Sequence, residues 1–175
     1  MRANSGNTII RHLRRAVLFQ EGAGLTDGQL LAAFVSRQDE TAFAALVRRH
    51  GPMVLNVCRR VLRNAHDADD AFQATFLVLV RKAGSIGLPE LLANWLYGVA
   101  YNTARKARAA ASKRRQREKP MATIPEPPMT EPALWQDLQP LLDQELSRLP
   151  EKYRVPIILC NLEGKSIKDA ARHLN

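Results

Sequence analysis

Residues 95–115 read WLYGVAYNTARKARAAASKRR, an alanine- and arginine-rich stretch without proline that predicts one continuous helix. At 100° per residue, one arc collects the apolar and small side chains expected to face a core. These are Leu96, Val99, Ala100, Thr103, Ala107 and Ala110. The opposite side carries a stripe of Tyr97, Tyr101, Arg105, Arg108 and Ser112, flanked by Asn102, Lys106 and Lys113. The helix therefore has a second face that packing against a core does not require.

The stripe of tyrosines and arginines suits single-stranded nucleic acid. Aromatic rings offer flat surfaces to unstacked bases, worth about 1–3 kcal/mol per base, and arginines follow phosphates or stack themselves. A closed duplex exposes no base faces, so the stripe fits opened nucleic acid better than a double helix. The alternative is a solvated basic helix whose tyrosines only cover its edge.

The composition of the 175-residue chain favours an all-helical protein with a polyanionic partner. Helix formers dominate, and β-branched and aromatic residues form no alternating runs. A formal net charge of +9 and a pI near 10.2 point to nucleic acid or an anionic membrane surface. No run of about 18 apolar residues could span a membrane, and the AVLF that follows Arg11, Arg14 and Arg15 is too short for a signal peptide. We expect a cytoplasmic protein.

The sequence indicates neither catalysis nor a metal site. Cys58 and Cys160 lie in separate apolar segments without a CxxC pair, which favours two buried thiols in a reduced compartment. There is no Walker loop, nucleophile elbow, HExxH motif or dinucleotide fingerprint. Asp67, Asp69 and Asp70 could be mistaken for a metal cluster, but acids at a helix start explain them more simply. We expect no enzyme, no cofactor and no metal.

Composition divides the chain into four segments. Residues 1–24 are an extension with one short basic helix, residues 25–117 a compact block, residues 118–132 a proline-rich linker, and residues 133–175 a second block. Residues 101–119 hold eight basic side chains and one acid, whereas residues 120–150 hold five acids and one arginine. Opposite charges of this kind usually separate a polyanion-binding block from one with another task.

Local signals predict where the helices of the first block begin and end. Thr26 is the expected cap of the first helix. Gly51-Pro52 is expected to break the next apolar pattern into two helices, because proline cannot donate a backbone hydrogen bond and disfavours a helical residue before it. Asp67 is the expected cap of the following helix, which Gly84 would end.

That helix, over residues 67–83, carries a second candidate site. Its buried stripe is expected to comprise Ala68, Phe72, Thr75, Phe76 and Leu79. The far side then carries Asp69, Asp70, Gln73, Leu77 and Val78. Apolar side chains beside acids and an amide on an exposed face resemble a protein-docking patch. Alternatively, another helix of the same domain covers Leu77 and Val78.

The second block predicts three helices, over residues 133–150, residues 151–164 and the final SIKDAARHLN. Ser166 and Asp169 form a capping-box pattern at the start of the third. This third helix looks like the first helix of a helix-turn-helix motif, in which a second helix enters the major groove and contacts bases. No such second helix follows in the sequence.

Three stretches in this order resemble the extracytoplasmic-function (ECF) group of bacterial RNA polymerase sigma factors. They are DADDAFQATFLVLVRKA, NWLYGVAYNTARKAR and LDQELSRLPEKYRVPIILCNLEGKS. The resemblance covers residues 25–175 and implies an all-α chain. Residues 25–117 would be sigma region 2, which binds core polymerase and melts the promoter, and residues 133–175 an incomplete, helix-turn-helix sigma region 4. Relatives continue with a recognition helix, so we expect a chain truncated within this motif and a loss of minus-thirty-five recognition.

The resemblance also implies roles for residues. The helix with Asp70 and Gln73 would dock on the coiled coil of the largest catalytic subunit, and Ala74 stands where many relatives have an acid. The loop over residues 85–90 and the helix over residues 94–115 would capture flipped bases and phosphates of the minus-ten element. The expected DNA-binding residues are Trp95, Tyr97, Tyr101, Asn102, Arg105, Lys106, Arg108, Lys113, Arg114 and Arg115.

The sequence therefore predicts a non-enzymatic initiation factor whose partners are core RNA polymerase and promoter DNA, and the resemblance allows an anti-sigma factor as a further partner. The first rival is a sequence-independent single-stranded nucleic-acid-binding protein without a polymerase partner. The second rival is a peripheral membrane protein with arginine-rich helices. It fits poorly, because the tyrosine–arginine face lacks a broad apolar surface.

Overall fold

The computed structural model describes residues 24–117 and 131–174, and every regular element in these ranges is helical. The predicted all-α fold class is therefore confirmed. Side chains are described for residues 24–114, 138–172 and 174. The expected N-terminal helix and nearly all of the expected linker lie outside the described residues.

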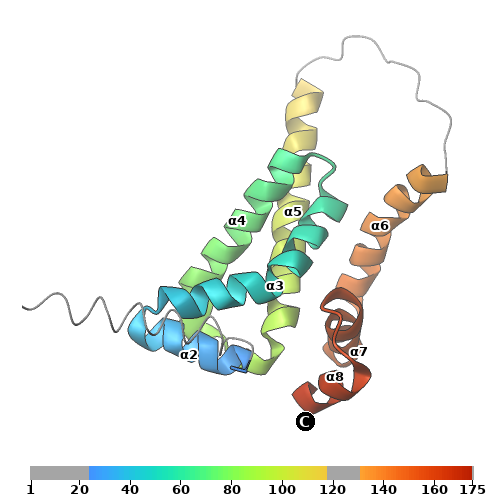
Figure 1. Cartoon of the computed structure of the whole chain (residues 1–175). Helices are drawn as coiled ribbons and strands as arrows, with labels where there is room; N and C mark the ends of the chain where they lie inside the picture. Colours follow the sequence, from blue (N-terminus) through green and yellow to red (C-terminus); the bar gives the residue numbers. More distant parts are fainter. Residues whose placement is uncertain (1–23, 118–130, 175) are drawn as a thin grey trace, which may run out of the picture.

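The first bundle consists of four helices joined by short connections (Figure 1). They are α2 (Asp27–Arg37), α3 (Glu40–Val61), α4 (Ala65–Lys82) and α5 (Leu92–Arg117). Two short turns, η1 (Ala83–Ser85) and η2 (Pro89–Leu91), connect α4 to α5. α3 contacts each of the other three helices, and α5 lies against both α3 and α4. Leu46, Val54, Leu79 and Leu96 are fully buried between them, so the core of the bundle surrounds α3.

Side-chain caps start α2 and α4. Thr26 caps α2, as predicted, and its Oγ1 accepts from the backbone N–H of Gln29 at 3.2 Å. The cap of α4 is Asn64 and not the predicted Asp67, because Asn64 Oδ1 accepts from the backbone N–H groups of His66 and Asp67 at 2.8 and 3.2 Å. Asp67 lies in the first turn instead, where its charge favours the helix N-terminus.

α3 is unbroken, and the predicted interruption at Gly51-Pro52 is wrong. Pro52 lies on the exposed side of the helix, where water can replace the hydrogen bond that its ring removes. Gly51 is buried, and a Cβ at this position would lie 3.7 Å from the ring of Phe72. Leu46 and Val54 continue one buried face across the proline. Burial of that face outweighs the cost of an internal proline, about 3 kcal/mol.

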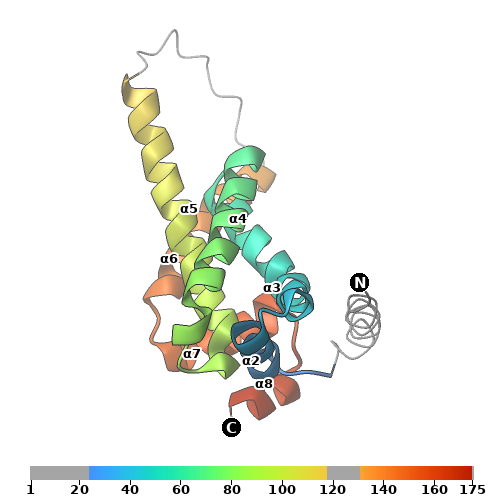
Figure 2. The ribbon, with the colours of Figure 1, turned by 90° about the vertical axis from the view of Figure 1, so that its left-hand side faces the viewer.

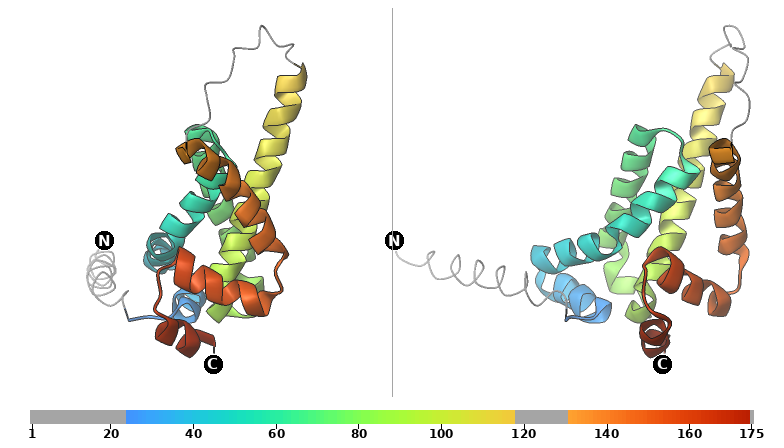
Figure 3. Two further views of the ribbon diagram at one scale, coloured as in Figure 1. Left: turned by 90° about the vertical axis from the view of Figure 1, so that its right-hand side faces the viewer. Right: turned by 45° about the vertical axis from the view of Figure 1, so that its right-hand side comes forward.

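The C-terminal helices lie along one side of the bundle, against α3 and α5 (Figure 3). They are α6 (Glu131–Arg148), α7 (Glu151–Ile157), the π-helical turn η3 (Ile158–Leu162) and α8 (Ile167–Leu174). Gly164 adopts a left-handed conformation, with φ of 68°, and so ends the helical segment formed by α7 and η3. Ser166 Oγ accepts from the backbone N–H of Asp169 at 3.1 Å, which confirms the predicted cap.

The two thiols differ in burial. Cys58 is buried in α3, as predicted, and burial raises its pKa to about 11. Cys160 is only half-buried in η3, so the prediction of a second buried thiol is wrong. The apolar sequence around Cys160 does not reveal how much of the cysteine side chain the neighbouring helices cover.

A buried ionic cluster joins the C-terminal helices to the bundle. His50 on α3 is fully buried between Asp27 and Glu163. Its Nδ1 contacts Glu163 Oε1, and its Nε2 lies 3.1 Å from Asp27 Oδ2 but out of line for a hydrogen bond. Burial on its own would lower the pKa of His50, but the two carboxylates outweigh it and raise the pKa to about 9. Protonated His50 therefore shares the neutralisation of the two buried carboxylates with Arg49, which pairs with Asp27, and Lys165, which pairs with Glu163.

Raising the pH from 6.5 to 8.5 should lower the free energy of unfolding by about 2 kcal/mol, because folded His50 holds its proton more tightly than the unfolded chain does. This stabilisation is complete below the unfolded pKa of 6.5 and is lost as the pH rises through about 9. Urea denaturation across this range measures the change. His50→Gln should flatten the pH dependence, whereas His66→Gln, at an exposed histidine, is the matched control. Equal slopes in the wild type and His50→Gln would contradict the role of His50.

Candidate functional site

One side of α4 is exposed along most of its length. Asp69, Asp70 and Gln73 are exposed, and Leu77 leaves 59% of its surface uncovered one turn further on. Val80, 45% exposed, continues the same side. These five residues form the α4 face. None of the described helices covers Leu77, so the alternative that a neighbouring helix hides it is wrong.

A groove of about 710 Å³ lies between α5 and the connection from α4. Residues 85–88 and Leu91 line the connection side. The α5 side is lined at helical spacing by Trp95, Gly98, Val99, Asn102, Thr103 and Lys106. Val78, which is half-buried, belongs to this groove and not to the α4 face.

The α5 wall of the groove combines groups that nucleic acids require. Trp95 is half-buried and presents part of an aromatic ring, while Asn102 and Lys106 are exposed beside it. An aromatic surface, an amide and a cation can stack a base, hydrogen-bond its edge and contact a phosphate. Val99 and Thr103, predicted for the core, are half-buried and line this groove instead.

Tyr97 and Tyr101 do not lie on an exposed stripe, and this part of the sequence prediction is wrong. Only 1% of Tyr97 and 8% of Tyr101 are exposed, and their rings stack at 6.3 Å with an interplanar angle of 3°. The Tyr97 hydroxyl donates to the backbone oxygen of Asp143 at 3.1 Å and lies 3.3 Å from its Oδ1. Burial raises the pKa of Tyr97, and Asp143 raises it further. In this conformation neither ring can contact a base.

Tyr97 is held beneath α6, whose Asp143 accepts from its hydroxyl, and Tyr101 stacks on the ring of Tyr97. Helical periodicity places them at the edge of the bundle core, beside Ala100 and Ala104, which are fully buried. A ring at the edge of the core is exposed if no further helix packs on it, and buried if one does. α6 follows the linker, so no spacing within α5 could predict this contact.

The C-terminal half of α5 keeps the exposed part of the predicted stripe. α5 rises past the ends of α3 and α4 (Figure 2). Ala110, predicted for the core, is exposed there for this reason. The basic side chains exposed along this half are Arg105, Lys106, Arg108, Lys113 and Arg114. The side chain of Arg115 lies outside the described residues. This basic end of α5 suits the phosphates of a nucleic-acid backbone.

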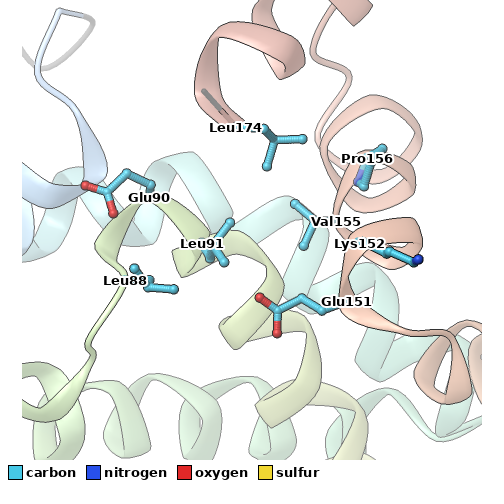
Figure 4. Close-up of a pocket in the computed structure, with 8 residues that line it drawn as sticks. All are labelled: Leu88, Glu90, Leu91, Glu151, Lys152, Val155, Pro156 and Leu174. Carbon is cyan, nitrogen blue, oxygen red and sulfur yellow. The ribbon is translucent and has the colours of Figure 1, made fainter.

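A second hollow, of about 640 Å³, lies between the α4–α5 connection and the C-terminal helices (Figure 4). Leu88 and Leu91 line it from the connection, and Val155 and Leu174 line it from α7 and α8. Leu88, Leu91 and Glu151 also line the groove, so the two hollows adjoin. The C-terminal helices therefore form part of the surroundings of the candidate nucleic-acid site.

Comparison with known proteins matches two segments of the chain to sigma factor families. Residues 46–115 match Sigma-70 region 2, and residues 140–175 match Sigma-70, region 4. The chain is 31% identical over 150 residues to the ECF RNA polymerase sigma factor SigM of Mycobacterium tuberculosis, a match that covers 85% of this chain and 74% of that relative. This chain belongs to the ECF family of sigma factors.

Other relatives of this sigma factor match it over a similar length. It is 30% identical over 159 residues to the ECF RNA polymerase sigma-E factor of Haemophilus influenzae, covering 84% of this chain and 82% of the relative. It is 25% identical over 159 residues to the ECF RNA polymerase sigma factor SigW of Bacillus subtilis, covering 81% of each. The family resemblance drawn from the sequence is confirmed. The bounds predicted for its four segments stay a prediction.

The region 2 match contains the α4 face of the sigma factor and every groove residue of α4, α5 and their connection, whereas Glu151 of the groove lies outside it. Sequence reasoning missed Val80 and Gly98 in these surfaces. The spacing of Asp70, Gln73 and Leu77, continued by three residues, predicts Val80 on the α4 face. Gly98 was missed because it lines the groove opposite residues 85–88, and helical periodicity does not predict where such an irregular connection lies.

Leu77→Ala should leave the stability of this sigma factor nearly unchanged, within about 0.5 kcal/mol, because Leu77 is exposed. Leu79→Ala, two positions away on the same helix, should cost about 2–5 kcal/mol, because Leu79 is fully buried. Urea denaturation of the two variants measures the difference. Comparable destabilisation of both variants would show that the α4 face is covered in solution.

Proposed function

We propose that this sigma factor binds core RNA polymerase through the α4 face and delivers the groove and basic end of α5 to the minus-ten element of an opening promoter. It would act in the cytoplasm as a non-enzymatic transcription initiation factor. The observation that carries the proposal is Leu77, which is 59% exposed beside two acids and an amide on a helix whose opposite side is core.

The α4 face has the chemistry of a protein-docking surface. Leu77 and Val80 are apolar side chains that a partner can bury, and burial of such anchors supplies much of the affinity of an interface. Asp69, Asp70 and Gln73 surround them with acceptors that can pair with basic side chains of a partner. An acidic rim favours a protein over nucleic acid at this face, because phosphates would be repelled.

The groove and the basic end of α5 support binding to an opened promoter. Trp95, Asn102 and Lys106 line a groove of about 710 Å³, large enough for an unstacked base. Arg105 and Arg108 are exposed further along the same helix, where they can contact successive phosphates. Specificity would come from few bases, and affinity largely from phosphates.

The combined substitution Asp70→Arg and Gln73→Ala should weaken binding to core polymerase by about tenfold or more, since it reverses a charge beside the apolar anchor. Co-purification with core polymerase measures this effect. Binding to free single-stranded DNA should survive in the same variant. Glu40→Arg, a charge reversal at the exposed start of α3, is the matched control and should keep polymerase binding. Unchanged co-purification of the α4 variant would rule out this face.

Arg105→Ala with Arg108→Ala should weaken binding to a single-stranded minus-ten oligonucleotide. The slope of log affinity against log salt should fall by about 0.7 for each phosphate that the variant no longer neutralises. Fluorescence anisotropy at several salt concentrations measures the slope. Arg148→Ala removes an exposed arginine of α6 and should leave the slope as it is. A slope that does not change in the α5 variant would place the nucleic-acid contacts elsewhere.

The first rival, a nucleic-acid-binding protein without a polymerase partner, predicts that the α4 variant and the wild type behave alike in both assays. In the part of the chain that the structure describes, no helix is both long and apolar enough to cross a membrane. The expected loss of minus-thirty-five recognition and the expected anti-sigma partner stay predictions.

A further inference from the structure

We propose that the exposed side of α3 is a second nucleic-acid-binding surface, which contacts the phosphates of closed duplex DNA. It complements the groove and the basic end of α5, which suit an opened strand. The inference goes beyond the proposed function, because it depends neither on the α4 face nor on binding to core polymerase.

α3 contains two pairs of adjacent arginines, and the two members of each pair point in different directions. The second members, Arg49 and Arg60, each donate to a buried carboxylate of another element, at 2.5 and 2.7 Å. The first members, Arg48 and Arg59, are exposed. The packing of the molecule therefore explains Arg49 and Arg60, whereas Arg48 and Arg59 contribute positive charge to the surface.

The exposed arginines share one face of the helix. At 100° per residue, Arg48, Pro52, Asn56 and Arg59 fall within an arc of about 80°, and all four are exposed. These residues form the α3 face. Arg63, which is also exposed, continues the positive charge into the turn that follows the helix.

Acidic side chains are nearly absent from α3. Its one acid, Glu40, lies about two turns before Arg48 and points about 80° away from it around the helix. The acids of α4 begin only after the turn, at Asp67. The α3 face therefore presents arginine and amide groups without a carboxylate among them, which is the charge pattern that a polyanion requires.

The chemistry of the α3 face favours phosphates over bases or a protein partner. Guanidinium and amide groups donate hydrogen bonds to phosphate oxygens. The one aromatic residue of α3, Phe43, packs against Phe34 and Phe76 with ring centroids 5.0 and 6.3 Å away, so it cannot stack on a base. The face also has no large apolar anchor comparable to Leu77 on α4.

These properties suit a closed duplex better than an opened strand. A duplex presents its phosphates and hides the faces of its bases, whereas an opened strand gains affinity from aromatic stacking, which Trp95 offers in the groove. Arg48 and Arg59 lie about 17 Å apart along the helix axis. That distance equals about five steps of 3.4 Å along one strand of a duplex, so both arginines can reach phosphates of the same strand.

Arg48→Ala with Arg59→Ala should weaken binding to a fully paired duplex. The slope of log affinity against log salt should fall by about 0.9 for each phosphate that is no longer neutralised, and so by about 1.8 for both. Fluorescence anisotropy with a labelled blunt-ended duplex at several salt concentrations measures the slope. The slope for a single strand of the same sequence should stay as it is in the wild type.

The matched control is Arg37→Ala with Arg81→Ala, which removes the same charge at exposed arginines of α2 and α4. This control should keep the wild-type slope for the duplex. An unchanged slope in the α3 variant would overturn the proposal. An equal fall in both variants would overturn it too, since net charge alone would then explain the effect. A fall of the same size with the single strand would remove the assignment to duplex DNA.

Asn56→Lys guards against a loss of binding that comes only from misfolding. It adds a cation to the middle of the α3 face and should raise the slope for the duplex by about 0.9. A misfolded chain would not show this gain. If the double alanine variant loses its helical circular dichroism signal, Asn56→Lys decides, and a slope that does not rise would overturn the proposal.

The outcomes also separate the α3 face from the proposed function. Duplex binding that depends on Arg48 and Arg59, in a chain that does not bind core polymerase, would retain the α3 face and remove the initiation role. Binding to core polymerase by a chain whose duplex slope ignores these arginines would retain the initiation role and remove the α3 face.

Discussion

An unbroken α3 is the constraint on which the other elements depend. Its burial of one continuous face across Pro52 keeps His50 and Arg60 on the same helix, about 15 Å apart along its axis. α4 and α5 pack against α3, and the C-terminal helices form ion pairs with both His50 and Arg60 in addition to burying Val155, Ile158 and Leu159. A break at Gly51-Pro52 would free the two attachment points from one another. The internal proline is therefore retained within a helix that organises both parts of the chain.

The packing around α3 assigns separate tasks to its neighbours. α4 is packed along one side only, which leaves an acidic and apolar face for a protein partner. α5 is packed along two sides at its start, by the bundle and by α6, and along neither at its basic end. The same helix thus contributes to the core, to a groove and to a phosphate-binding surface. Which of its side chains are accessible depends on where the C-terminal helices lie.

Local patterns in the sequence predicted the all-helical class, most helices and the exposure of Asp70, Gln73 and Leu77. They succeeded because one buried stripe defines α4 whatever its partner is. They failed at Pro52, where tertiary burial overrides a local preference. They failed also at Tyr97, whose hydroxyl donates to a helix that lies beyond the linker, and at Tyr101, which stacks on Tyr97. The buried pairing of His50 with Glu163 joins residues 113 apart in sequence, so no local spacing could indicate it.

We propose the exposed face of α4 as the surface that holds core polymerase. A photo-crosslinking amino acid placed at Leu77 tests it most directly in a mixture of the sigma factor and core polymerase, with the same probe at exposed Leu141 for comparison. We expect a crosslink from position 77 to the largest polymerase subunit that the probe at 141 does not make. A probe at 77 that crosslinks to no polymerase subunit, or no more than the probe at 141, would contradict it.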